Sequence, residues 1–353
     1  MKKRFAALLL TCAMAVSICA CGAPAATNDA PGGSAASDGG EQWERRTIRI
    51  GHDNSASHAA HRACEQLAEK IAEATGGAVT IEIYPSGTLG SSSDMVSQIV
   101  QGTLDATFTG TAALSEYDPL MNVVDVPYLK DTVEEYQEMY NGPFGDAVAE
   151  IIEKGCNAVM VDFLSIGGFR HMTNNVRPII TPDDLKGLKI RIASSDIRGK
   201  FFDECGASGI SMTFSEVFTA LQQGTIDGQE NPLATIQMNK LSEVQKYLSL
   251  TGHIYSAYAF MFSAVKWNEY QPELQELLMT YGKEVGQWER QQILVEEDAL
   301  LQELKEEGME VNEVDLAAFR ERAGAVWAYF IQTYGDAGRE LLDLAEVDYE
   351  KYL

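Results

Sequence analysis

The stretch LQQGTIDGQENP at residues 221–232 repeats, almost letter for letter, the stretch IVQGTLD at residues 99–105. In both copies an apolar helical pattern runs into Gln-Gly-Thr and then into a short segment with an aspartate. Gly102 and Gly224 suit the end of a helix, because glycine adopts left-handed backbone angles without strain. The same junction at two places in one chain predicts two halves built on one plan.

Upstream of the first copy, the segments TIRIG (47–51) and VTIEIYP (79–85) alternate apolar and polar residues as strands do. Residues 58–75 carry an apolar stripe at helical spacing. A second helix is expected before Gly102, capped by Ser93 or a neighbour, and TLDATF (103–108) is expected to form a third strand.

The second half has the same order of elements. LKIRI (188–192) is predicted to be a strand, Ser194 or Ser195 to start a helix, and ISMTF (210–214) to lead into a further helix with Thr213 and Glu216 at capping-box spacing. Alternating strands and helices predict parallel βα units. We therefore expect an α/β protein with two similar lobes and a ligand cleft between them.

Beyond residue 255 the pattern is helical. Long apolar stripes occupy residues 272–307 and 315–346, and predict long C-terminal helices whose acidic residues face solvent.

The first residues predict export. A cationic start at Lys2, Lys3 and Arg4 precedes the apolar run FAALLLTCAMAVSICA, so residues 1–20 are expected to be a signal peptide. The following Ala20-Cys21 resembles the lipoprotein processing site, which predicts cleavage before Cys21 and acylation of its thiol. Ordinary secretion with cleavage nearby is the alternative. Residues 21–45 are rich in Gly, Pro and Ser and are expected to act as a flexible tether.

Charge and cysteine content narrow the possible partners. The net charge is −25, from 27 basic and 52 acidic residues, which excludes nucleic acid as an expected partner but not a small anion held in a pocket. No later segment is apolar for long enough to span a bilayer. Cys64, Cys156 and Cys205 have no metal-like spacing and are expected to be buried apolar residues.

Two arginines are hard to explain as parts of a buried sheet. Arg191 lies near the end of LKIRI, on the opposite face from its aliphatic neighbours, and Arg170 follows the apolar strand AVMVDFLSI (158–166) and two glycines. Ligands of open α/β sheets bind beyond the carboxyl ends of the strands. Because a buried guanidinium needs an acidic partner or an anionic ligand, these two positions predict a clamp for a carboxylate. Structural ion pairs are the alternative.

Other candidates lie at the same strand ends. Asn231 precedes Pro232, which holds its backbone extended and makes its amide a polar contact or a turn residue. Phe214 could stack on a ligand or belong to the core. His52 and Asp53 occupy the loop after the first strand. His58, His61 and Cys64 lie near them, but their spacing matches no metal motif, and we expect neither metal nor cofactor.

Four segments resemble the solute-binding proteins of tripartite ATP-independent periplasmic (TRAP) transporters, of the C4-dicarboxylate-binding type. They are TGGAVTIEIYPSGTLG (75–90), GGFRHMTNNVRPI (167–179), PDDLKGLKIRI (182–192) and MTFSEVFTALQQGTIDGQENPL (212–233). The resemblance extends from about residue 46 to near the C-terminus.

The resemblance implies roles for individual residues. Arg191 would form a salt bridge with the ligand carboxylate, Arg170 would be a second carboxylate contact, and Asn231 a polar contact. The resemblance also implies that Phe214 lines the pocket and that Asp53 or His52 supplies a contact from the first lobe. Glu230, which is next to Asn231, and Ser194 are further ligand-binding candidates.

The resemblance also implies a two-lobed, periplasmic-binding-protein-like architecture. In that architecture crossing strands and long helices join the lobes, which close on the ligand like a hinged trap. We expect one lobe to comprise residues 46–167 and about 257–296, and the other residues 168–256 and about 297–353. The implied partners are a small organic acid and the integral membrane subunits of a TRAP transporter. The expected location is the periplasm or the outer face of the cytoplasmic membrane, with attachment through a lipid.

The ligand class is narrowed by departures from the family's sialic-acid binders. Ser91 and Gly110 stand where those proteins have acidic residues, which argues against sialic acid. Hydroxyls at Ser91, Ser92, Thr109 and Thr111 favour a sugar acid such as a uronate or aldonate, while a C4-dicarboxylate or keto acid stays open.

A secreted α/β enzyme acting on a similar acid is the alternative function. The chain has none of the nucleophile, zinc-protease, phosphate-loop or dinucleotide motifs, and we do not expect an enzyme. A surface structural or adhesion protein is a third possibility.

Overall fold

The structure is a computed structural model that describes residues 43–352. The predicted signal peptide, Cys21 and residues 21–42 of the predicted tether lie outside the described residues. Of the remaining tether residues, Trp43 packs against the apolar cluster beneath the first strands, and the backbone N–H of Glu44 donates to the side chain of Gln271.

The first half forms three parallel strands with two helices between them. Its elements are β1 (Arg46–His52), α1 (Ala59–Ala74), β2 (Val79–Tyr84), α2 (Ser92–Gln101) and β3 (Ala106–Gly110). Strand β1 is central and pairs in parallel with both β2 and β3. The predicted strands and helices are confirmed, although the third strand begins at Ala106 and not at residue 103. The cap of α2 is Ser91 rather than Ser93, and it forms a capping box with Asp94.

The second half repeats this arrangement. Its elements are β5 (Lys189–Ile192), α5 (Asp196–Glu204), β6 (Ser208–Ser211), α6 (Phe214–Gln222) and β7 (Gly228–Pro232). Strand β5 is central and pairs in parallel with β6 and β7. Ser195 caps α5 as one of the two predicted alternatives. Thr213 is the N-cap residue of α6, as predicted, but its hydroxyl donates to the Glu216 carboxylate at 2.6 Å and accepts no backbone hydrogen bond, so no capping box forms.

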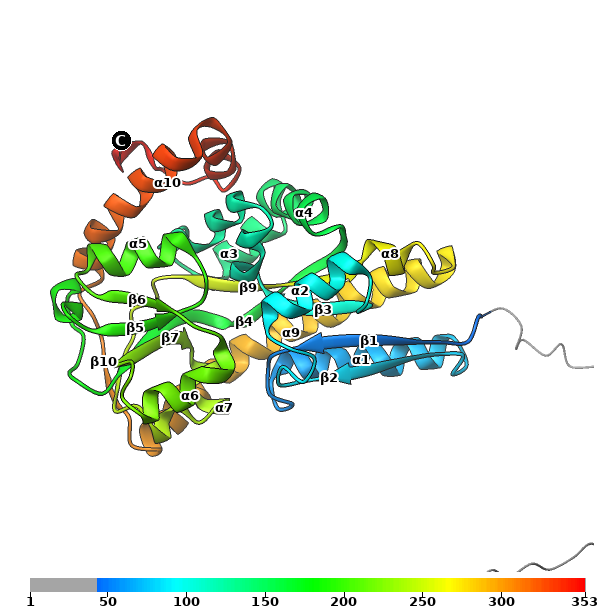
Figure 1. Cartoon of the computed structure of the whole chain (residues 1–353), viewed down its shortest axis with the longest axis horizontal. Coiled ribbons are helices and arrows are strands. Elements are labelled where there is room, and N and C mark those ends of the chain that lie inside the picture. Colours follow the sequence, from blue (N-terminus) through cyan, green and yellow to red (C-terminus); the bar gives the residue numbers. More distant parts are fainter. Residues whose placement is uncertain (1–42, 353) are drawn as a thin grey trace, which may run out of the picture. The chain divides into compact units, whose positions relative to one another are not determined.

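Two antiparallel strands join the halves into one sheet path. Strand β4 (Ala158–Asn174) pairs first with β9 (Tyr255–Ser263) and then with β7, which gives the order β2-β1-β3-β9-β4-β7-β5-β6. Figure 1 shows β4 and β9 running between the two sets of parallel strands. These are the crossing strands that the family resemblance implies. The short strands β8 (Tyr247–Ser249) and β10 (Glu310–Asn312) pair with each other beside β4.

Strand β4 changes partners at a bulge. Its register with β9 shifts between Ser165 and Phe169, and Gly167 and Gly168 there have φ of +126° and +87°. A side chain on Gly167 would also lie 3.0 Å from the Cβ of Ala234, so both the backbone angle and the close packing require glycine. The predicted strand 158–166 is therefore the first part of a longer strand.

The two long C-terminal helices are confirmed as α9 (Pro272–Glu306) and α10 (Leu316–Leu344), the latter kinked at Gly335. Helix α9 packs against α1 and β4 and reaches α7, whereas α10 packs against α5 (Figure 1). No helix within residues 43–352 combines the length and apolar character that a bilayer crossing requires. The remaining helices are α3 (Val133–Tyr140), α4 (Pro143–Cys156), α7 (Leu233–Met238) and α8 (Ala264–Trp267), and the short 3-10 helices are Thr111–Glu116, Pro119–Asp125, Pro182–Leu185, Leu241–Glu243 and Glu350–Tyr352.

The core consists of three apolar clusters that hold the strand ends in place. One lies between the first-half strands and α1 and α9, one beneath α6 and α7, and the largest extends from α2 through α3 and α4 to α10. Cys64, Cys156 and Cys205 are buried and free, as predicted.

Candidate functional site

A cavity of about 840 Å³ lies at the carboxyl ends of β1, β3, β5 and β7. This volume is in the range of small-molecule sites. Residues from both halves line it. The first half contributes Asp53, Asn54, Ser91, Ser92, Ser93 and Gly110, the second contributes Arg191, Ser194, Arg198, Phe214, Asn231 and Thr235, and the crossing strands contribute Ile166, Arg170 and Tyr258.

Arg191 is a buried cation with no acidic partner in the described part of the chain. It is 5% exposed, and its Nε and Nη2 donate to the backbone carbonyl of Met212 at 3.0 and 2.7 Å. Burial lowers its pKa to about 10, against the opposing effect of more distant carboxylates. The ring of Phe214 lies 5.6 Å from the guanidinium carbon. A desolvated charge compensated only by a carbonyl and an aromatic ring favours an anionic ligand.

Arg170 has a different environment, because Glu230 occupies two of its donors. Its Nε and Nη2 both donate to the Glu230 carboxylate, and Nη2 also donates to the side chain of Asn231 at 2.7 Å. Glu230 is fully buried behind the cavity wall and is not among the lining residues. The charge of Arg170 is therefore compensated within the protein.

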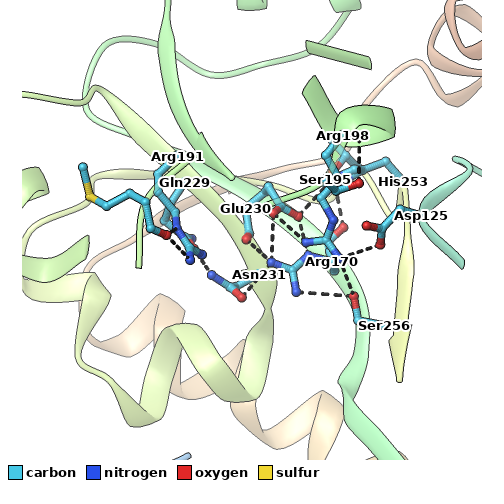
Figure 2. A network of polar contacts seen from close by, with 12 residues as sticks. Asp125, Arg170, Arg191, Ser195, Arg198, Gln229, Glu230, Asn231, His253 and Ser256 are labelled. Atoms are coloured by element: carbon cyan, nitrogen blue, oxygen red, sulfur yellow. Dashed lines mark hydrogen bonds and ion pairs between the residues drawn. The ribbon is translucent and has the colours of Figure 1, made fainter. Parts of the chain in front are cut away.

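A second arginine shares the same carboxylate. Arg198 of α5 donates to Glu230 at 3.1 Å and to Asp125 at 2.7 Å, and His253 Nε2 lies 3.3 Å from Glu230. Figure 2 shows Glu230 between the guanidinium groups of Arg170 and Arg198, with Arg191 apart from them. Although burial raises the pKa of Glu230, the two arginines hold it well below its usual range. We call Arg170, Arg198, Glu230 and Asp125 the four-charge cluster.

Asn231 connects this cluster to the rest of the wall. Its Oδ1 accepts from Arg170, its Nδ2 donates to the side chain of Gln229, and its side chain is 4% exposed at the cavity. The backbone lies in β7, paired with His171 of β4, so the sheet fixes the position of the amide.

The first-half candidates separate into one residue that lines the cavity and one that does not. Asp53 lines it, half-buried, and accepts a hydrogen bond from Ser92 at 2.6 Å. Burial raises the pKa of Asp53. His52 is fully buried away from the lining, with Nε2 3.0 Å from Nδ1 of His61. Burial and the neighbouring His61 lower the pKa of His52 to about 3, so it is neutral at physiological pH.

The other predicted positions are also accounted for. Ser194 and Phe214 line the cavity. Ser91 and Ser92 line it as well, whereas Thr109 and Thr111 are buried outside the lining. Within residues 43–352, no group of three or more His, Cys, Asp or Glu side chains is arranged to hold a metal ion.

Several lining residues were not predicted from the sequence. Arg198 pairs with Asp125, which is 73 positions earlier, and no local pattern signals that contact. Asn54 and Thr235 are each 7% exposed, and Nδ2 of Asn54 and Oγ1 of Thr235 have no hydrogen-bond partner in the described chain. The Oδ1 of Asn54 accepts from the hydroxyl of Tyr258. The sequence offered one signal that Asn54 lines the cavity, namely its position directly after Asp53 in the strand-end loop.

Comparison with known proteins gives consistent matches. Residues 50–333 match the family described as bacterial extracellular solute-binding protein, family 7. The 2,3-diketo-L-gulonate-binding periplasmic protein YiaO of Escherichia coli is 33% identical over 281 residues, which are 79% of this chain and 85% of that protein.

Two solved structures illustrate the range of bound acids. A TRAP periplasmic solute-binding protein from Roseobacter denitrificans with bound L-galactonate has a TM-score of 0.80 and 30% identity, covering 86% of this chain and 99% of that one. One from Sulfurospirillum deleyianum with bound succinate has a TM-score of 0.81 and 25% identity, with the same coverage of 86% and 99%.

Proposed function

The chain belongs to the bacterial extracellular solute-binding proteins of family 7, the TRAP type, and on that premise we propose that its cavity captures an organic acid for delivery to the membrane subunits of a TRAP transporter. The observation that carries the proposal is Arg191, a cation that is buried in the cavity wall with only a carbonyl and an aromatic ring as partners. The Nη1 group of Arg191 donates to no described residue. A ligand carboxylate can therefore dock on the Nη1–Nη2 edge, which matches carboxylate geometry.

A sugar acid, such as a uronate or an aldonate, is the ligand class that we propose. The hydroxyls of Ser91, Ser92, Ser93 and Ser194 line the cavity and offer both donors and acceptors to a polyhydroxylated chain. A relative that binds 2,3-diketo-L-gulonate and a structural neighbour that binds L-galactonate support this class. A C4-dicarboxylate is the second candidate, supported by the neighbour that binds succinate.

Arg170, Asn231 and Phe214 are proposed as further ligand contacts, with Ser194 and Asp53 at the wall. Glu230 acts through Arg170 in this proposal, since it does not reach the cavity itself. His52 is proposed to have no direct contact, because it lies behind the lining and bonds to His61.

The test is a thermal-shift screen of the secreted protein against uronates, aldonates, C4-dicarboxylates and keto acids, with the uncharged parent sugars as controls. A ligand that binds only the folded state raises the unfolding temperature by an amount that grows with the ratio of its concentration to its dissociation constant. We expect at least one sugar acid to raise the unfolding temperature and the matching neutral sugar to have no effect. The absence of a response to every acid would overturn the proposal.

Binding without chemical conversion is part of the proposal. Its support is the membership of a family of solute-binding proteins. The protein should return its ligand chemically unchanged after prolonged incubation, as judged by nuclear magnetic resonance, and a new product would favour the enzyme alternative.

We also propose that residues 1–20 direct export and that Cys21 carries a lipid anchor. The relative in Escherichia coli is described as periplasmic, which supports an extracytoplasmic location. Labelling cells with palmitate should mark the wild-type protein and leave the Cys21→Ala variant unlabelled. Equal labelling of both proteins would disprove the anchor at Cys21.

The proposed lobes are residues 46–167 with about 257–296, and residues 168–256 with about 297–353. The shift of register between Ser165 and Phe169 coincides with the first boundary and supports a hinge there. Small-angle scattering should show a decrease in the radius of gyration when the ligand binds, and an unchanged radius would count against closure.

A further inference from the structure

The charges around the cavity leave room for one negative charge from a ligand. Three arginines line the cavity, and none of its lining residues is a lysine. Glu230 and Asp125 compensate Arg170 and Arg198 within the four-charge cluster. Arg191 is the one arginine of the lining without a carboxylate in contact with it in the described chain. A single carboxylate on the ligand is enough to balance its charge.

The first-half wall has the opposite charge. Asp53 is half-buried there, and the exposed Asp94 and Glu116 lie along the same wall. The charges of Asp53 and Arg191 interact, because each affects the pKa of the other. Exposed carboxylates are screened by solvent and salt, so Asp53 has the strongest electrostatic effect inside the cavity of these three carboxylates.

Two neutral polar groups, one on each side of the cavity, have no hydrogen-bond partner in the described chain. The Nδ2 of Asn54 and the Oγ1 of Thr235 are buried at the cavity wall without a hydrogen bond from the described chain. Asp53 can accept further hydrogen bonds through its carboxylate oxygens. These groups suit the hydroxyls of a ligand, because hydroxyls both donate and accept and bring no charge.

We propose that the cavity selects monocarboxylates over dicarboxylates, and that Asp53 is the residue that disfavours a second carboxylate on the ligand. This inference rests on the proposed function and sharpens it from organic acids to polyhydroxylated acids with one carboxylate. A second carboxylate at the Asp53 wall binds either against the charge of Asp53 or together with a proton. Either way of binding lowers the affinity at neutral pH, and the lining offers no further uncompensated cation to offset this loss.

The experiment is calorimetric titration of the secreted protein with a matched pair of ligands at pH 7.5. Galactonate and galactarate share a six-carbon polyhydroxyl chain and differ only in whether the far end is an alcohol or a carboxylate. We expect the wild-type protein to bind galactonate at least tenfold more tightly than galactarate.

Two variants locate the effect. Asp53→Asn keeps the size of the side chain and its ability to accept from Ser92, but removes the charge. We expect it to narrow the ratio of the two affinities at least fivefold. Glu116→Gln removes an exposed charge from the same wall and should change that ratio less than twofold. If Asp53→Asn does not fold, Asp53→Ser makes the same test. The ratio of the wild-type affinities for galactonate and galactarate tests the selectivity without either variant.

Each result has one meaning. Equal wild-type affinity for galactonate and galactarate would overturn the selectivity while leaving the proposed function intact. A wild-type preference for galactonate that survives in Asp53→Asn would overturn the role of Asp53. Binding of neither ligand, together with no response in the wider acid screen, would contradict the proposed function itself.

Discussion

The surroundings of Arg170 and Arg191 differ although the two residues look alike in the sequence. Both follow apolar strand residues and both line the cavity, at 3% and 5% exposure. Arg170 belongs to the four-charge cluster, where Glu230 is its ion-pair partner. Arg191 has a backbone carbonyl and an aromatic ring instead. The difference separates a charge that is compensated within the protein from one that has no carboxylate partner in the described chain, and it depends on whether a carboxylate from a distant segment reaches the guanidinium.

The largest expected effect is on the four-charge cluster. Replacing Glu230 by Gln keeps the shape but leaves Arg170 without an anion and Arg198 with Asp125 alone. Loss of one partner from a buried ion pair typically costs about 3–5 kcal/mol. We expect the free energy of unfolding, measured by urea denaturation, to fall by about that amount.

The exposed Glu216 is the matched control, because its carboxylate accepts only from the nearby Thr213. Glu216→Gln should leave the urea midpoint unchanged. If Glu230→Gln were as stable as this control, the four-charge cluster would not organise the fold and the contrast between the arginines would fail.

A buried carboxylate without a cation in contact sharpens the comparison. Glu289 of α9 is fully buried, accepts from the backbone N–H of Ser165 at 2.9 Å, and has no partner for its Oε1 in the described chain. Burial raises the pKa of Glu289 from 4.5 to about 8. Between those two values the unfolded chain has lost the proton while the folded protein keeps it. Stability from this group is therefore complete below pH 4.5 and decreases as the pH rises to about 8.

The variant Glu289→Gln has no proton to lose. We expect it to gain about 2–4 kcal/mol in unfolding free energy relative to the wild type when the pH is raised from 5 to 8.5. Thermal and urea denaturation at the two pH values measure the gain. Parallel pH profiles for the two proteins would show that Glu289 is not held protonated.

The effect on binding should be concentrated at Arg191. Arg191→Lys keeps the charge but loses the planar fork, and we expect ligand affinity to fall by about 2–3 kcal/mol, roughly 30- to 150-fold. Its free energy of unfolding should change by less than about 1 kcal/mol, because no buried carboxylate loses its partner. Calorimetry and urea denaturation on one preparation give both quantities. If Arg191→Lys lost stability but kept its ligand affinity, the account would be contradicted, because Arg191 would then stabilise the fold and not bind the ligand.

The smallest expected effect concerns the ring beside Arg191. Phe214→Leu removes the aromatic face 5.6 Å from the guanidinium but keeps an apolar side chain. A cation–π contact contributes about 0.5–1 kcal/mol, so the affinity should decrease about two- to fivefold. Calorimetry resolves such a change, and an increase in affinity would show that the ring does not stabilise the Arg191 cation in the complex with the ligand.

The sequence was informative where structure depends on neighbouring residues. Helix stripes and glycine stops predicted α1, α5, α6 and both long helices, and the repeated Gln-Gly-Thr junction predicted two similar halves. It was less informative for residues 111–157, where α3 and α4 form part of the largest core cluster. That segment repeats nothing in the other half, so the argument from repetition could not reach it.

The site was predictable at the strand ends and not beyond them. Arg191 and Asn231 lie near the carboxyl ends of β5 and β7, and Asp53 directly follows β1. The rule for open α/β sheets places such residues at one cavity. The contacts of Arg170 and Arg198 depend on Glu230 and Asp125, which approach them only through the fold. The sequence therefore could not distinguish the compensated arginine from the uncompensated one.

A crystal structure of the protein with a bound sugar acid tests the central claim most directly. We expect the ligand carboxylate to lie within hydrogen-bond distance of Arg191 while the Glu230 carboxylate stays on Arg170 and Arg198. A ligand whose carboxylate makes no contact with Arg191, or an acidic side chain of the protein found on Arg191 in its place, would contradict the account.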